Sequence, residues 1–367
     1  MRDFSESPML VIWELTQACD LACRHCRASA QPDRSQDELT TAEAYSVLDQ
    51  IREFGNPLVV FTGGDPLKRP DLFNIIQRSV ALGFRTTVTP SATPLLTRAA
   101  IAQFKECGLA RMAVSLDGPD RASHDGFRGV EGSFARTMSA LQFAARIGLE
   151  TQVNTTVTRH NVARLEEISA IVAASQARLW SVFFLVVTGR AQLEDDLSAM
   201  EYEQVFEFLY RTSLHAPFDI KTTEAPHYRR FNVQHRKSQP ASSPAPATSL
   251  IQRHAGINDG KGLLFISHTG ELYPSGFLEL SAGNVKTRSL TDAYRNSDLF
   301  RVIRDTDQLE GKCGRCEYKN LCGGSRSRAF ALTGNFMASD PRCEYEPDHA
   351  FSEETIAMEP KNKHATT

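Results

Sequence analysis

The feature that most constrains the fold is an alternation of apolar segments with helical segments, repeated six times between residues 10 and 214. The apolar segments, such as LVIWEL (10–15), contain β-branched residues and are typical of strands buried on both faces. In the first helical segment, 40–55, Thr40 or Thr41 can cap the start and Gly55 can end the helix. The pattern predicts a parallel sheet with helices outside, either as an open doubly wound sheet or as a barrel. The expected strands, with the turns that end them, are 10–15, 58–66, 85–92, 110–119, 150–158 and 179–190.

Both topologies place ligand chemistry at the carboxyl ends of the strands. Two short motifs lie at such positions: GGDP (63–66) after the second strand and SLDG (115–118) after the fourth. Glycines allow a backbone to approach a ligand closely, and polar side chains at strand ends can contact it. An ordinary turn is the other interpretation of each motif.

Cys19, Cys23 and Cys26 are spaced C-x3-C-x2-C in the stretch WELTQACDLACRHCRASA, directly after the first strand. Thiolates are soft ligands that suit iron–sulfur clusters or zinc. Three thiolates without a nearby fourth indicate a cluster with one open iron, whereas His25 as a fourth ligand would make a zinc site.

The other cysteines are Cys107, to which we assign no role, and a group of four near the C-terminus. The N-terminus lacks the cationic start and apolar run of a signal peptide, and no apolar stretch is long enough to span a membrane. We therefore expect a cytoplasmic protein whose grouped cysteines form metal sites and not disulfides. The net charge of −3 gives no basic field for nucleic acid.

The C-x3-C-x2-C motif after a short apolar strand resembles the signature of radical S-adenosylmethionine (radical SAM) enzymes. The resemblance implies that Cys19, Cys23 and Cys26 are catalytic and hold a 4Fe–4S cluster, with SAM chelating the fourth iron. It selects the partial (β/α)6 TIM-like barrel from the two topologies. It also implies reductive cleavage of SAM to a 5′-deoxyadenosyl radical, hydrogen abstraction from a substrate, and an external one-electron donor of the flavodoxin or ferredoxin type.

The same resemblance implies a set of SAM contacts. The residue before the third cysteine lies near the adenine, the GGDP backbone receives the SAM amino group, and Arg128 holds the carboxylate. Asp65 stands where the family usually has Glu, so a side-chain role there does not carry over from the family. The expected contacts are His25, Gly63, Gly64, Asp65, Ser115, Asp117, Arg128, Asn154, Thr156, Gly189 and Arg190.

Beyond the barrel, the sequence predicts a small α+β domain of a hairpin and helices. Four thiolates in this region, C-x2-C-x5-C plus a distant cysteine, suit zinc or a 4Fe–4S cluster equally by count. The spacing resembles SPASM or twitch auxiliary-cluster domains. Full SPASM domains hold two auxiliary clusters, but the positions of the cysteine ligands of the first are occupied here by His254, Ser275 and Ser325-Arg326. The resemblance therefore implies one auxiliary 4Fe–4S cluster, for electron transfer or structure. Its expected ligands are Cys313, Cys316, Cys322 and Cys343.

Composition suggests four parts. Residues 1–235 form the radical SAM barrel, and 236–250, rich in Pro, Ser and Ala, form a flexible linker. Residues 251–349 form the auxiliary-cluster domain, and 350–367 form a disordered tail.

The substrate is less constrained. The sequence around the cysteines is most similar to that of enzymes that modify side chains of haem-type or haem d1-type tetrapyrroles. Maturation of a ribosomal peptide or protein is the alternative. The short stretch before residue 10 leaves no room for a leader-binding domain, which favours a small molecule or a separately presented peptide. A non-catalytic iron–sulfur or zinc scaffold is the alternative of another class. The run KTTEAPHYRR (221–230) could line a pocket for an acidic substrate or form a solvated face.

Overall fold

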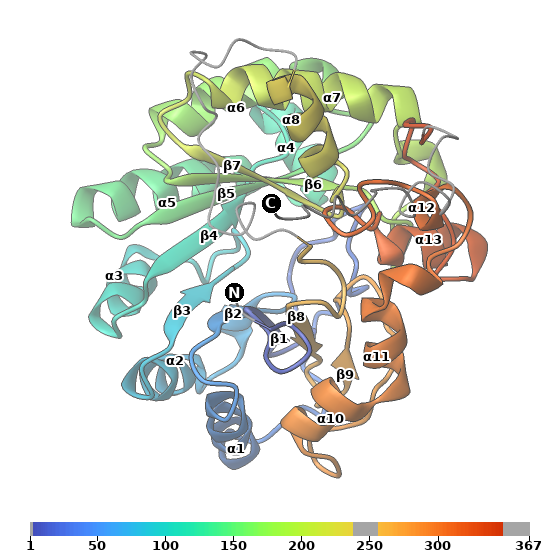
Figure 1. Ribbon diagram of the computed structural model, residues 1–367. Helices are drawn as coiled ribbons and strands as arrows, with labels where there is room; N and C mark the ends of the chain where they lie inside the picture. Colours follow the sequence, from blue (N-terminus) through green and yellow to red (C-terminus); the bar gives the residue numbers. More distant parts are fainter. Residues whose placement is uncertain (1–2, 238–255, 348–367) are drawn as a thin grey trace, which may run out of the picture.

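The computed structural model describes residues 3–237 and 256–347. Within them, one curled sheet carries helices on its outer face (Figure 1). The strand order is β7-β6-β5-β4-β3-β2-β1-β8-β9. All neighbours pair in parallel except β8 and β9, which are antiparallel. The strands are β1 (Leu10–Glu14), β2 (Leu58–Thr62), β3 (Arg85–Val88), β4 (Arg111–Ser115), β5 (Thr151–Val157), β6 (Leu179–Phe184), β7 (Asp219–Thr223), β8 (Leu263–Ile266) and β9 (Leu272–Tyr273).

The helices of the barrel and of the C-terminal region alternate with or follow these strands. The barrel helices are α1 (Thr41–Arg52), α2 (Leu72–Ala81), α3 (Arg98–Glu106), α4 (Arg121–Arg128), α5 (Ser133–Ile147), α6 (Leu165–Ala174), α7 (Ala199–Ser213) and α8 (Tyr228–Lys237). The C-terminal helices are α10 (Leu290–Asn296), α11 (Asp298–Arg304), α12 (Gly311–Gly314) and α13 (Arg326–Thr333). None of the helices in the described ranges is long and apolar enough to cross a membrane.

Side chains of successive strand residues point to opposite faces of the sheet. Val11 and Val59 are fully buried on the outer face in the core shared with the helices. Ile12 and Val60, their neighbours in sequence, line a cavity on the inner face. The predicted strands are therefore apolar on both faces for two reasons, since one face packs against helices and the other encloses a cavity.

The six strand–helix units and the partial barrel agree with the sequence prediction. The first helix begins where a capping box forms, because Thr40 accepts from the Glu43 amide and the Glu43 side chain accepts from the Thr40 amide. Two features were not predicted. The sheet continues to β7, and the expected hairpin, β8–β9, adds to the same sheet through parallel pairing of β8 with β1.

The predicted division into parts stays a proposal. Arg236 and Lys237 end α8, whereas the rest of the expected linker and the whole expected tail lie outside the described residues. His254 lies outside them as well.

Arg328 of α13 joins the C-terminal region to the barrel. Its guanidinium lies 3.2 Å from a carboxylate oxygen of Asp340, and both side chains are almost completely buried. It also donates to the carbonyl of Leu185 after β6 and to the carbonyl of Glu224 after β7. Burial alone would raise the pKa of Asp340, but the charge of Arg328 and further interactions lower it to about 2. One cation thus stabilises the junction of three segments that are distant in sequence.

Replacement of Arg328 by methionine is expected to destabilise the protein by about 3–5 kcal/mol, because Asp340 would remain charged and buried without its partner. The measurement is the free energy of unfolding in urea, followed by circular dichroism. The control is Arg211→Met, which removes an exposed pair with Glu207 one helical turn away and should cost less than about 1 kcal/mol. Equal losses in both variants would contradict this role of Arg328.

Candidate functional site

The three N-terminal cysteines line one cavity of about 210 Å³ at the carboxyl ends of the strands. The amides of Leu21 and Ala30 point at the sulfurs of Cys19 and Cys26, each at 3.4 Å. Burial raises the pKa of Cys19 to about 11 and also raises the pKa of Cys23. Buried thiols of this kind stay protonated unless a metal displaces the proton, as in a metal-thiolate site.

The cysteines are not arranged around a single ion. Sulfurs that share one zinc ion at about 2.3 Å lie within about 4 Å of one another. Among residues 3–237 and 256–347, no group of three or more His, Cys, Asp or Glu side chains is placed to hold a metal ion. The count of three cysteines around one cavity suits a cluster with one open iron.

His25 fits the predicted position beside a bound ring. Its ring stacks on Phe127 with centroids 4.4 Å apart and planes 14° apart. It lines the cavity, and its buried Nδ1 has no hydrogen-bond partner in the described part of the chain. Burial lowers the pKa of His25 to about 3, so the ring is neutral. A neutral ring with an unsatisfied nitrogen suits a polar ligand in this cavity.

The GGDP turn separates into a lining part and a supporting part. Gly63 and Gly64 line the cavity, and a Cβ on Gly64 would lie 2.5 Å from the carbonyl oxygen of Ala18 in the cysteine loop. Asp65 is fully buried and accepts from the Thr93 hydroxyl at 2.7 Å and the Leu67 amide at 3.1 Å. Its side chain holds the turn and does not line the cavity.

The SLDG motif divides in the same way. Ser115 lines the cavity, whereas Asp117 is buried and accepts from Arg128 Nε at 2.7 Å and from the Thr156 amide at 2.8 Å. Burial alone would raise the pKa of Asp117, but the charge of Arg128 together with further interactions, such as the Thr156 amide, holds the pKa below its usual range. Arg128 also lies 3.6 Å from the sulfur of Cys23, so Asp117 fixes an arginine at the cavity wall.

Gly189 and Arg190 support the cysteine loop from the turn that follows β6. The Arg190 amide donates to the Cys26 carbonyl at 3.0 Å, and its guanidinium donates to the Cys23 carbonyl at 3.0 Å. Gly189 has a φ of +61°, and a Cβ there would lie 2.3 Å from the Cys26 carbonyl oxygen. Arg190 also lines the cavity, where its Nη2 has no partner in the described residues.

The structure brings most of the predicted SAM contacts to one wall. The predicted residues that line the cavity are Cys19, Cys23, His25, Cys26, Gly63, Gly64, Ser115, Arg128, Asn154, Thr156 and Arg190, and those behind it are Asp65, Asp117 and Gly189. Sequence reasoning missed other lining residues, notably Thr62, Thr89 and Phe183. Their positions at the inner face near strand ends are the signal that could have identified them.

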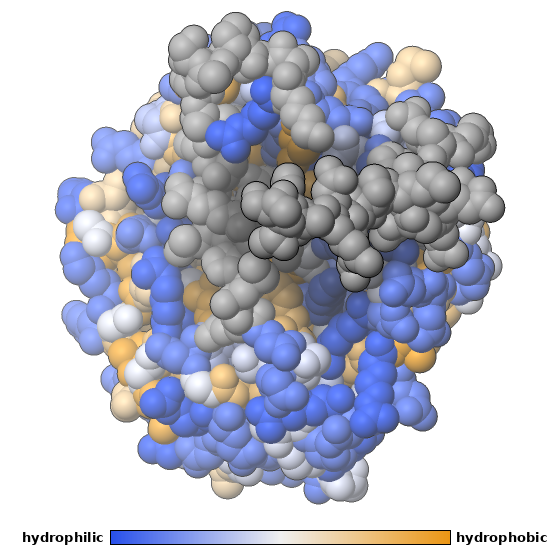
Figure 2. Space-filling model, in the orientation of Figure 1, coloured by the Kyte–Doolittle hydropathy of each residue, from blue (hydrophilic) through white to orange (hydrophobic). Residues whose placement is uncertain are grey.

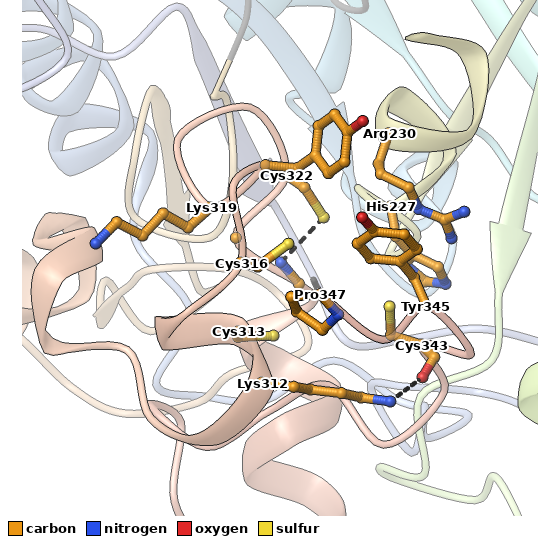
Figure 3. Close-up of a pocket in the computed structure, with 13 residues that line it drawn as sticks. His227, Arg230, Lys312, Cys313, Cys316, Lys319, Cys322, Cys343, Tyr345 and Pro347 are labelled. Atoms are coloured by element: carbon orange, nitrogen blue, oxygen red, sulfur yellow. Dashed lines mark hydrogen bonds between the residues drawn. The ribbon is translucent and has the colours of Figure 1, made fainter. Parts of the chain in front are cut away.

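The C-terminal cysteines line a separate, small cavity of about 20 Å³. Figure 3 shows Cys313, Cys316, Cys322 and Cys343 around this space, with His227 on one side. The Gly324 amide lies 3.3 Å from the Cys322 sulfur, and burial raises the pKa of Cys343 to about 12. Four thiols with amide donors and little exposure fit a fully ligated cluster.

A third cavity of about 280 Å³ occupies the inner face of the sheet. It shares Asn154, Phe183 and Phe277 with the cavity of the N-terminal cysteines. Figure 2 shows hydrophobic side chains in the central hollow of a mostly hydrophilic face. Lys221 of β7 and Arg229 of α8 line this barrel cavity. The run 221–230 therefore contributes to a pocket and is not a solvated face.

Together, the fold and the sites are those of an iron–sulfur enzyme with a large cavity beside its N-terminal cysteines. The family model named Radical SAM superfamily matches residues 13–170. An "AdoMet-dependent heme synthase" of Oleidesulfovibrio alaskensis is 40% identical over 95% of this chain and 90% of its own. One of Methanosarcina barkeri is 34% identical over 94% and 98%. The chain belongs to the radical SAM superfamily, and its cofactors are a 4Fe–4S cluster and SAM.

Solved structures agree with the fold. SuiB of Streptococcus suis bound to S-adenosylmethionine superposes with a TM-score of 0.74 at 18% identity, covering 93% of this chain and 78% of its own. The structure called native anSMEcpe with bound AdoMet gives a TM-score of 0.64 at 14% identity, covering 87% and 90%.

Gly189→Ala is expected to lower iron and sulfide incorporation several-fold, because the new methyl group would collide with the carbonyl of Cys26 and displace the cysteine loop. The measurement is iron and sulfide per chain after anaerobic reconstitution. The matched control is Gly55→Ala, at a φ of +91° with no atom within 4 Å of the new Cβ. The Gly55→Ala variant carries similar backbone strain far from the cysteine loop and should incorporate iron and sulfide normally. Normal loading of both variants would contradict the supporting role of Gly189.

Proposed function

We propose that this enzyme is an AdoMet-dependent haem synthase that oxidises carboxylate-bearing side chains of an iron tetrapyrrole. The observation that carries the proposal is the barrel cavity, which has apolar walls, adjoins the N-terminal cysteines and contains two cations without acidic partners. Neither Lys221 nor Arg229 has a carboxylate within salt-bridge distance among the described residues; Arg229 donates only to the Leu321 carbonyl, at 3.3 Å. Burial, with a contribution from the charge of Arg111, lowers the pKa of Lys221 to about 8. A bound carboxylate would compensate both buried charges.

The relatives point in the same direction. The "AdoMet-dependent heme synthase" proteins align over nearly the whole chain, and a "Pre-heme d1 synthase" of Dinoroseobacter shibae is 28% identical over 91% of it. The names of these three relatives concern tetrapyrroles, and a flat apolar macrocycle with acidic side chains matches the composition of the cavity wall.

The N-terminal site would supply the radical. In this proposal Cys19, Cys23 and Cys26 hold the cluster, and the bound cluster and SAM supply a 5′-deoxyadenosyl radical. His25, Arg128 and Arg190 would contact SAM together with Gly63, Gly64, Ser115, Asn154 and Thr156. Asp65, Asp117 and Gly189 would position these groups from behind, as their buried contacts indicate.

The C-terminal site would receive an electron. Haem has vinyl groups at two positions where iron-coproporphyrin III has propionates. Each propionate that becomes a vinyl group loses a hydrogen atom, CO₂ and one electron. We assign a 4Fe–4S cluster to Cys313, Cys316, Cys322 and Cys343, and electron transfer as its role. The wall between the barrel cavity and this site is thin, since Arg229 lines the cavity and donates to the carbonyl next to Cys322.

A flavodoxin or ferredoxin in the cytoplasm is the proposed source of the reducing electron, as unpaired cysteines suit a reducing compartment.

Peptide maturation is the second candidate. A "PqqA peptide cyclase" of Gluconobacter oxydans is 28% identical over 97% of the chain. Its identity is well below that of the haem-synthase relatives, so we place it second.

Anaerobically reconstituted protein, given SAM, dithionite and iron-coproporphyrin III, is expected to form haem and 5′-deoxyadenosine, detected by liquid chromatography and mass spectrometry. Cys23→Ala should form neither product, because the cluster loses a ligand. Deoxyadenosine without any change in the tetrapyrrole would reject the haem-synthase proposal and leave radical SAM chemistry intact.

Lys221→Met and Arg229→Met are each expected to weaken binding of iron-coproporphyrin III about 10-fold or more, because each removes a charged hydrogen bond worth about 1.5–3 kcal/mol. Binding is followed by the visible absorbance of the tetrapyrrole. Arg211→Met, on the outer surface, is the control and should leave the affinity unchanged. Wild-type affinity in both cavity variants would show that the carboxylates bind elsewhere.

A further inference from the structure

Glu224 is an acidic residue in a cavity that we propose to hold an anion. It follows β7 directly, lines the barrel cavity and adopts a left-handed backbone with a φ of +58°. Such a conformation is unfavourable for a residue other than glycine and persists only where surrounding contacts fix it. Here the Glu224 carbonyl accepts from Arg328 at 2.6 Å, which holds the turn in place.

Both carboxylate oxygens of Glu224 face serine hydroxyls. Oε2 lies 2.5 Å from Ser325 Oγ, and Oε1 lies 3.4 Å from Ser275 Oγ. Ser275 and Ser325 occupy two positions at which the resembling enzymes carry cysteine ligands of a first auxiliary cluster. In this chain they are hydrogen-bonded to a carboxyl group.

Glu224 and Asp259 compete for one of their hydrogen-bond donors, the hydroxyl of Ser275. Ser275 has one hydroxyl hydrogen and also faces Asp259, so it can donate to only one of the two acids. Asp259 has donors of its own, the amide and the hydroxyl of Ser327 at 2.8 Å and 2.9 Å. Ser325 is thus the one donor that Glu224 does not share, whereas Asp259 has two such donors.

The charged groups around Glu224 do not stabilise an ionised carboxylate by a hydrogen bond. Arg328 directs its guanidinium to Asp340 and to backbone carbonyls, including that of Glu224, and not to the Glu224 carboxylate. Asp259 and Asp340 add negative charge nearby. Burial, followed by the charge of Asp259, raises the pKa of Glu224 to about 8.

We infer that Glu224 is a neutral carboxylic acid that donates a hydrogen bond to a substrate carboxylate in the barrel cavity, beside the cations Lys221 and Arg229. The inference rests on the proposed function only in that the substrate carries carboxylates. A neutral acid donates to an anion without adding a further buried charge, whereas the ionised form would repel the same anion. Glu224 is thus a specificity-determining residue for carboxylate-bearing substrates.

The test is the affinity for iron-coproporphyrin III between pH 6.5 and pH 9, in wild type and in Glu224→Gln. Glutamine keeps a donor at this position and cannot ionise. The ratio of the wild-type Kd to the variant Kd should stay near one at pH 6.5 and rise to about tenfold at pH 9, as Glu224 ionises. The ratio cancels the effect of Lys221, which loses its charge over the same range. Repeating the series in a Lys221→Arg background, where that cation does not titrate, should give the same rise.

A second measurement needs no ligand and checks the protonation state directly. The infrared difference spectrum between wild type and Glu224→Gln at pH 7 should contain the carbonyl band of a neutral carboxyl group. Thermal unfolding establishes that the variant is folded. A carboxylate band in its place would overturn the inference.

The outcomes separate this inference from the proposed function. A Kd ratio that does not change with pH, while the wild type binds the tetrapyrrole, overturns the role of Glu224 alone. Absence of binding by the wild type at every pH contradicts the proposed function and the inference together.

Discussion

The parallel pairing of β1 with β8 is the constraint on which the rest of the structure depends. β1 carries the cysteine loop at its carboxyl end and is hydrogen-bonded to β2 on one side and to β8 on the other. Because β8 comes from beyond residue 255, the C-terminal region must lie beside the N-terminal cluster site. The loop then receives close backbone contacts from Gly64 and Gly189, where a side chain would collide. The position of the cysteine loop is thus determined by sheet pairing and by the lack of a side chain at Gly64 and Gly189.

One short segment forms the wall between the two sites. Lys221, Glu224 and Arg229 line the barrel cavity, whereas His227 and Arg230 line the cavity of the C-terminal cysteines. Residues of this segment line one cavity or the other because the chain leaves β7, turns at Glu224 in a left-handed conformation and enters α8. A substrate held by the first group would lie next to the second site, which suits removal of an electron from the substrate and excludes a long transfer path.

The sequence predicts the parts that depend on local pattern. The six strand–helix units follow from apolar periodicity, and the cysteines that line the two cavities follow from their spacing. It did not predict β7, because its sequence, DIKTT, is polar and contains one buried residue, Ile220. It also did not predict that β8 pairs with β1, since parallel pairing between distant segments leaves no local signal.

Side-chain roles at the site were predicted less well than positions. Asp65 and Asp117 lie in the expected motifs, yet both are buried behind the cavity and act on a neighbouring turn or arginine. Burial is a property of the complete fold, so motif spacing alone could not separate lining residues from supporting ones. The same holds for Ser275 and Ser325, whose bonds to Glu224 connect segments far apart in sequence.

The most direct test of the account is the fate of the hydrogen atom that the substrate loses. Iron-coproporphyrin III deuterated in its propionate side chains would be turned over anaerobically with unlabelled SAM, and the 5′-deoxyadenosine would be analysed by mass spectrometry. A substrate bound in the barrel cavity beside the N-terminal cluster should transfer deuterium to the deoxyadenosine. Deoxyadenosine without deuterium, formed at the same rate with and without the tetrapyrrole, would contradict the account.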